Sequence, residues 1–128
     1  MNIKEENKKM LLKDYIKMHE LSIVQSMMKI IEKHAKNREV ERLVVKIGKM
    51  SGIEPYFLKE SFDFFKEGTV CANAEMEIIE VNIKIKCFEC GSESEIKGFD
   101  FHCPVCGSEK TKIISGEEMH IEYIELKE

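Results

Sequence analysis

The sequence lacks several features that common classes of protein require. Its 128 residues contain no apolar run that approaches the length needed to cross a bilayer. Basic residues (20) do not exceed acidic ones (24), and the formal net charge of −4 argues against a general nucleic-acid binder, which normally carries a basic surplus. The first residues are too highly charged for the apolar region of a secretory signal. We therefore expect a cytoplasmic protein with no membrane and no nucleic-acid partner.

Familiar catalytic motifs are absent as well. The chain has no nucleophile elbow, no glycine-rich phosphate loop and no zinc-protease histidine helix. We therefore expect that the protein is not an enzyme. Hydrophobic residues nevertheless make up 43% of the chain, which is enough to build the core of one folded domain and argues against general disorder.

Four of the five cysteines form two pairs, Cys87-Phe-Glu-Cys90 and Cys103-Pro-Val-Cys106, and a glycine follows each pair. Two residues between thiolates let one turn direct both sulfurs at a single ion, and two such turns complete a tetrahedron. Because disulfides are rare in the cytosol, the pattern predicts a structural Zn(II) held by all four cysteines. Rubredoxin-type iron is the alternative metal. A thioredoxin-like redox pair is disfavoured because it would not need the second pair.

The segment between and around the pairs, residues 87–110, is called here the ribbon. Its charged side chains comprise five acids and two lysines, a local net charge of −3 that would repel a phosphate backbone: Glu89, Glu93, Glu95, Asp100 and Glu109 against Lys97 and Lys110. Because four thiolates already fill a tetrahedron, His102 is interpreted as an exposed turn residue, and the site has no open position for hydrolytic chemistry. Cys71, between Val70 and Ala72, is expected to be a small buried side chain.

The spacing of hydrophobic residues predicts the remaining helices and strands. Apolar residues recur at helical spacing over 20–36, and alternation predicts strands over 42–50, over 75–86 with a bulge near Ile78, and over 119–123. A second helix is expected to begin at Pro55, with Gly68 as its C-cap. The order predicts an α+β fold: two helices on a small three-stranded mixed sheet, with the four-cysteine zinc ribbon inserted between strands two and three. Residues 18–86 plus 111–128 would form an α/β domain, and residues 87–110 the zinc-binding ribbon.

From Met18 onward the chain resembles the HypA family of hydrogenase maturation factors, which are nickel chaperones. The resemblance rests on Met18-His19-Glu20-Leu21-Ser22, on Lys46-Ile47-Gly48 followed by Ser51-Gly52-Ile53-Glu54, and on Gly68-Thr69-Val70. It continues through Ala74-Glu75 and the two cysteine pairs to the last strand. The order of these motifs is much more specific than the cysteine pairs alone.

The resemblance implies a role for each part of the chain. His19 would be the principal ligand of a transferable Ni(II), with Glu20 contributing its backbone nitrogen or carboxylate and Glu54 as a weaker candidate. Cys87, Cys90, Cys103 and Cys106 would hold zinc. The implied partners are the HypB-type GTPase and the large subunit of nickel-iron hydrogenase, and the protein would act as a monomer or weak homodimer. The implied activity is metal transfer, in a nickel-binding domain formed by residues 18–86 plus 111–128.

One departure from the family pattern concerns the start of the chain. The family begins at Met-His-Glu, whereas residues 1–17 precede Met18 here. We interpret residues 1–17 as an N-terminal extension from a misassigned start. If they are translated, the terminal amine lies far from His19, and an upstream helix would commit the His19 amide to a backbone hydrogen bond. The runner-up function is a zinc-ribbon adaptor that binds protein without transferring nickel.

Overall fold

The structure is a computed structural model that describes residues 20–128. Within this range the first element is a helix over residues 20–35, called here the N-terminal helix, and the chain leaves it through Lys36 and Asn37, both at positive φ. None of the helices in the described part of the chain has the length and apolar character needed to span a membrane. The predicted ligand His19 lies outside the described residues.

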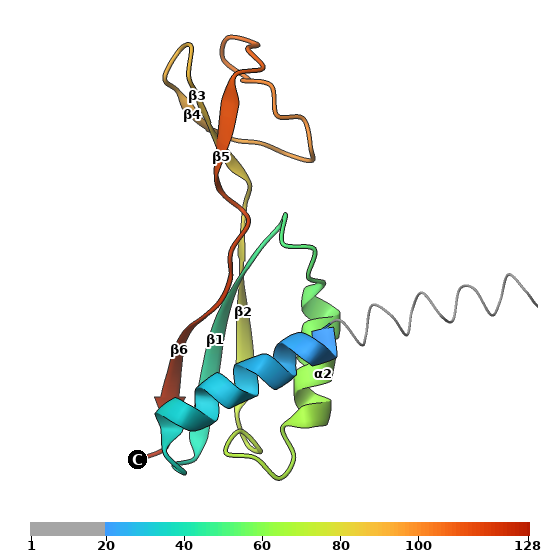
Figure 1. Cartoon of the computed structure of the whole chain (residues 1–128), viewed down its shortest axis with the longest axis vertical. Helices are drawn as coiled ribbons and strands as arrows, with labels where there is room; N and C mark the ends of the chain where they lie inside the picture. Colours follow the sequence, from blue (N-terminus) through green and yellow to red (C-terminus); the bar gives the residue numbers. More distant parts are fainter. Residues whose placement is uncertain (1–19) are drawn as a thin grey trace, which may run out of the picture. The chain divides into compact units, whose positions relative to one another are not determined.

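The main sheet has three strands in the order β2-β1-β6. They are β1 (Val40–Gly48), β2 (Glu75–Val81) and β6 (Met119–Leu126), and α2 (Pro55–Phe65) connects the first two. Backbone hydrogen bonds join Val40 to Val70 and Lys49 to Val81, so β1 and β2 are parallel, whereas bonds from Lys127 to Glu39 and from Gly48 to Glu118 make β6 antiparallel. Figure 1 shows the same directions. The predicted α+β fold with a three-stranded mixed sheet is confirmed.

Helix α2 begins where the sequence predicts, but ends earlier. Glu54 is its N-cap, and the Glu54 carboxylate accepts a hydrogen bond from the Tyr56 backbone N–H. Pro55 occupies the first turn, where a missing N–H costs nothing. The C-cap is Lys66 in the right-handed region, and Gly68, at φ +76°, lies in the turn beyond the helix. The prediction that Gly68 caps this helix was therefore wrong, because the chain turns before reaching it.

Two compact units divide the described chain. The first contains residues up to 44, together with 54–77 and 123–128. Its core is apolar and is supplied by the N-terminal helix, the first half of β1, α2 and the segment leading into β2. The fully or nearly fully buried apolar side chains are Val24, Met27, Met28, Ile31, Ala35, Val40, Leu43, Val44, Leu58, Phe62, Cys71, Ala74 and Met76. The prediction of a buried Cys71 is confirmed.

The second unit contains residues 45–53 and 78–122. It includes a second sheet in the order β4-β3-β5, formed by β3 (Lys84–Cys87), β4 (Glu93–Glu95) and β5 (Thr111–Ser115). β3 is antiparallel to both neighbours. The strand predicted over 75–86 is therefore wrong in extent: it ends at Val81, and residues 84–87 belong to the other sheet.

A close backbone contact occurs inside the second unit. The Met50 N–H donates to the Gly116 carbonyl at 2.7 Å, and a side-chain carbon added to Gly48 would lie 2.0 Å from that same oxygen. Only glycine allows so close an approach of two backbone segments. Gly48 and Gly116 thus fix how the end of β1 meets the segment between β5 and β6.

Candidate metal centres

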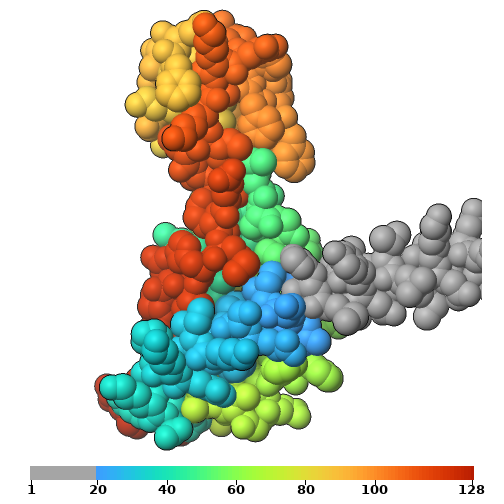
Figure 2. Space-filling model, viewed as in Figure 1, coloured from blue at the N-terminus to red at the C-terminus, as the bar shows by residue number. Residues whose placement is uncertain are grey.

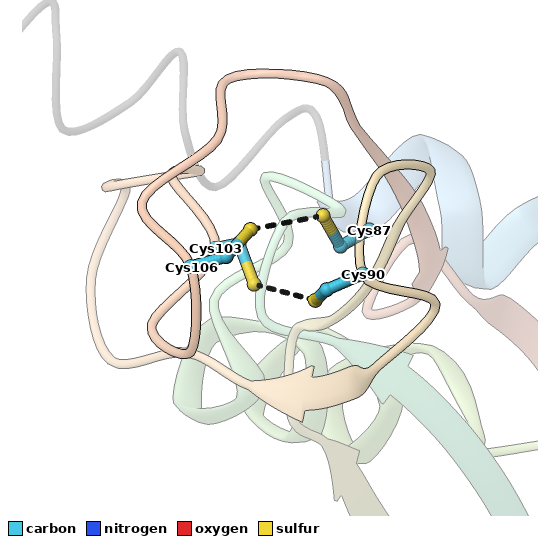
Figure 3. A group of neighbouring side chains, drawn as sticks. All are labelled: Cys87, Cys90, Cys103 and Cys106. Carbon is cyan, nitrogen blue, oxygen red and sulfur yellow. Dashed lines mark hydrogen bonds between the residues drawn. The ribbon is translucent and has the colours of Figure 1, made fainter.

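The four paired cysteines converge on one point (Figure 3). Each pair lies in the same kind of turn, because the N–H of the glycine after it donates back to the carbonyl of the first cysteine: Gly91 to Cys87 at 3.0 Å, and Gly107 to Cys103 at 2.8 Å. Both glycines have positive φ, 75° and 78°, as this turn requires. The sequence prediction that the two pairs meet is confirmed.

The sulfur spacing fits a tetrahedral ion. The four Sγ atoms all lie within 4.8 Å of one another, and Cys87–Cys106 and Cys90–Cys103 are each 3.6 Å apart. A zinc–sulfur bond of about 2.3 Å places the sulfurs of a tetrahedron about 3.8 Å apart. Only a small contraction of the cluster is needed to reach that geometry.

The electrostatics of the cluster call for a cation. A hydrogen bond with the Ser92 hydroxyl, helped by the Cys106 backbone N–H, lowers the pKa of Cys103 to about 6. The Ser108 backbone lowers the pKa of Cys106, but proton sharing with Cys87 and burial outweigh it and raise that pKa to about 12. A bound metal ion would favour the thiolate form of Cys106, because its positive charge offsets the repulsion between neighbouring sulfurs.

Ser92 forms hydrogen bonds with the cysteine cluster, a role that was not predicted from the sequence. Its hydroxyl lies 3.0 Å from the Cys90 sulfur and 3.5 Å from the Cys103 sulfur, and its carbonyl accepts from the Cys87 N–H at 2.9 Å. The Ser108 carbonyl accepts from the Cys103 N–H at the same distance. The second cysteine of each pair is followed by Gly-Ser. This repeat could have predicted the role of Ser92, because it places a hydroxyl and a carbonyl at equivalent positions of both turns.

His102 is exposed beside the cluster, as predicted, and both of its ring nitrogens have partners. Nδ1 lies 2.7 Å from an Asp100 carboxylate oxygen, and Nε2 lies 3.1 Å from an oxygen of Glu109. The hydrogen bonds to Asp100 and then to Glu109 raise the pKa of His102. Neither nitrogen is available to the ion in this arrangement.

The ribbon is the yellow to orange part of Figure 2. Its exposed residues include both acidic and apolar side chains. Phe88 and Val105, one within each cysteine pair, are 65% and 69% exposed, and Phe99 is 71% exposed. Where exposed apolar side chains form one continuous patch, they are typical of surfaces that contact another protein.

The candidate nickel residues meet at the start of α2. Glu20 and Glu54 are 34 positions apart, yet a Glu20 carboxylate oxygen, Oε1, lies 3.5 Å from the Glu54 backbone nitrogen. Glu20 is only 1% exposed, whereas Glu54 is exposed and its carboxylate accepts from the Tyr56 N–H at 3.2 Å. The structure thus brings these two residues together. His19 directly precedes Glu20 in the chain.

A family model described as "Hydrogenase/urease nickel incorporation, metallochaperone, hypA" matches residues 18–126. The chain is 46% identical over 113 residues to hydrogenase maturation factor HypA of Aquifex aeolicus, covering 86% of this chain and 98% of that one.

Two solved structures are similar to this one in fold. The solution structure of the nickel metallochaperone HypA from Helicobacter pylori is 29% identical, with a TM-score of 0.60 over 84% of this chain and 96% of that one. A solution structure of HypA protein is 30% identical, with a TM-score of 0.66 over 86% and 97%. Both similarities therefore extend over nearly the whole length of the related protein.

Proposed function

Because the chain belongs to the HypA family of hydrogenase and urease nickel-incorporation metallochaperones, we propose that it carries Ni(II) to the large subunit of nickel-iron hydrogenase together with a HypB-type GTPase. Nickel is the cargo of this activity, and no bond of an organic substrate is made or broken. The structural observation that supports the proposal is the contact between Glu54 and Glu20, the residue that follows His19 in the sequence.

The proposed nickel site is built around His19. Ni(II) favours tetragonal nitrogen donors. The His19 imidazole and the neighbouring backbone nitrogens supply such donors, with Glu20 contributing its backbone nitrogen or carboxylate. Glu54 is the weaker candidate, since one of its carboxylate oxygens already caps α2. A site that leaves positions open to exchange suits delivery, because a cargo ion must be released to the next protein.

The four-cysteine cluster is proposed to hold a structural Zn(II). Its sulfur spacing fits zinc, and four thiolates leave no open position at the ion. Zinc would therefore stay in place while nickel is transferred. In this assignment residues 87–110 form the zinc ribbon, and residues 18–86 plus 111–128 form the nickel-binding domain.

The start of the functional chain is part of the proposal. The family match begins at residue 18, and a chain that starts at Met18 would place its free amine one residue from His19. We propose that this amine completes the nickel donor set. Intact mass of the native protein tests it: a mass without residues 1–17 is expected, and a mass that includes them would contradict this part of the proposal.

Nickel transfer tests the function itself. The nickel-loaded protein, mixed with a purified HypB-type GTPase and the metal-free hydrogenase large subunit, is expected to pass nickel to the large subunit, and His19→Ala is expected to abolish the transfer. Binding of both partners without transfer would instead support the alternative, a zinc-ribbon adaptor. The exposed Phe88, Phe99 and Val105 are the observation that favours that alternative.

A further inference from the structure

A groove within the second unit has no role in the proposed function. It encloses about 560 Å³ and is lined by the link between β2 and β3 and by the turn that follows β4. Its apolar lining comprises Ile83, which is 3% exposed, the half-buried Ile96, and Phe99, which is 71% exposed. A concave surface with an apolar lining and a few polar groups is the usual form of a binding site. We call it the Phe99 groove.

Hydrogen bonds hold the walls of the Phe99 groove in place. The Ile96 backbone N–H donates to the Ile83 carbonyl at 3.0 Å. The Asn82 side-chain amide donates to the Glu95 carboxylate at 3.3 Å, and the backbone N–H of Lys49 donates to the last residue of β2 at 3.0 Å. Because these walls are joined before anything binds, an occupant meets a surface that needs little further ordering.

The charge of the Phe99 groove is opposite to that of the ribbon. Two exposed lysines, Lys49 and Lys97, line the groove together with one acidic residue, Glu95, so the described lining carries a net charge of +1. Neither lysine forms an ion pair within residues 20–128, whereas Lys110, elsewhere in the ribbon, lies 3.5 Å from a Glu89 carboxylate oxygen. Charges more than about 8 Å away are largely screened at physiological salt. The two lysines therefore determine which charge the groove accepts.

We propose that the Phe99 groove binds an acidic peptide segment of a partner protein. An aliphatic side chain of the segment contacts Ile83, Ile96 and Phe99, and carboxylates on either side of it pair with Lys49 and Lys97. A nickel carrier and the alternative adaptor both have to contact another protein. The inference goes beyond nickel transfer and rests on the groove alone, so its test needs no nickel.

NMR titration of the zinc-loaded full chain tests the proposal. The probe is the peptide Glu-Glu-Leu-Glu-Glu with acetylated and amidated ends. Two control peptides replace its glutamates by lysine or its leucine by alanine. Lys49→Glu and Lys97→Glu are compared with Lys112→Glu, which reverses an exposed lysine outside the groove. Phe99→Ala is compared with Phe88→Ala, because Phe88 is 65% exposed and does not line the groove.

The acidic peptide is expected to shift the amide signals of Ile83, Ile96 and Phe99 saturably, with a dissociation constant of about 1–10 mM. Each of the two lysine reversals in the groove should weaken binding about fivefold, since an attraction becomes a repulsion. Phe99→Ala and the alanine peptide should each weaken it about fivefold to tenfold through lost apolar contact. The Lys112→Glu and Phe88→Ala controls should stay within about twofold of the native protein.

Several results would overturn the proposal. One is the absence of saturable shifts at roughly 30 mM acidic peptide. Another is equal binding of the lysine peptide, or equal weakening by Lys49→Glu, Lys97→Glu and Lys112→Glu, because the groove would then not select acidic residues. Undiminished binding of the alanine peptide would indicate a general anion site. Equally tight binding of 4-methylpentanoate, an aliphatic acid without peptide groups, would indicate a small-molecule site instead.

Discussion

Replacing Cys90 by serine removes one of four sulfurs from the ribbon cluster, and zinc affinity is expected to fall at least about 100-fold. A structural zinc site contributes roughly 10–16 kcal/mol of binding free energy. One ligand in four therefore accounts for about 3 kcal/mol, and each 1.4 kcal/mol is a factor of ten. Cys71→Ser is the matched control, because Cys71 is buried but does not belong to the cluster.

The loss of zinc affinity should be accompanied by loss of order in the ribbon. Within residues 78–122 the buried apolar side chains other than cysteines are Ile83 and Ile85. Burial of two isoleucines supplies about 3–6 kcal/mol, whereas ordering the backbone costs roughly 1 kcal/mol or more per residue. The two side chains cannot hold the ribbon without the metal.

Zinc competition with a chelator and amide hydrogen exchange in β3 measure the two effects. Cys90→Ser is expected to lose zinc and the protection of the Ile85 amide together. Cys71→Ser should keep both, although it loses about 1–3 kcal/mol of folding stability because a hydroxyl is buried. Native zinc affinity in Cys90→Ser, or equal zinc loss in the two variants, would refute the assignment of the cluster as the zinc site.

Two further predictions concern the fold and the surroundings of the cluster. Gly48→Ala would place a carbon 2.0 Å from the Gly116 carbonyl oxygen, and thermal unfolding is expected to show a loss of about 3 kcal/mol. Gly52→Ala meets no atom within 4 Å but has φ +77°, so a smaller loss of about 1 kcal/mol is expected; the reverse order would contradict the close contact. Asp100→Asn is expected to lower the pKa of His102, followed by NMR titration, because Asp100 is the main cause of its raised value. The His102 contribution to stability is present at acid pH and is lost as pH rises through the raised pKa, so the variant should lose stability only on the acid side.

The parts that could be predicted from sequence depend on local rules. The spacing of Cys87, Cys90, Cys103 and Cys106 together with the following glycines determines the two turns, and their meeting was predicted correctly. Pro55 correctly marked the start of α2 because its ring is compatible with the first turn of a helix. Both features need only residues close in the chain.

The parts that could not be predicted depend on contacts between distant residues. Alternation from Met76 to Ile85 is interrupted only by one change of phase near Ile78, so the pattern favoured one bulged strand where the structure has β2 and β3 in separate sheets. The burial of Glu20 was not predictable either, since an acidic residue early in a helix is usually solvated. Its Oε1 atom accepts from the backbone nitrogen of Glu54, 34 residues away. The spacing of residues in the sequence does not predict this contact between Glu20 and Glu54.

The central claim, that His19 begins the site which carries nickel, is tested most directly by nickel titration of the full chain, of a chain that starts at Met18, and of each with His19→Ala. One nickel per chain is expected, bound more tightly by the chain with the free amine at Met18, and the His19→Ala proteins should lose this binding while retaining zinc. Nickel affinity unchanged by His19→Ala would contradict the claim.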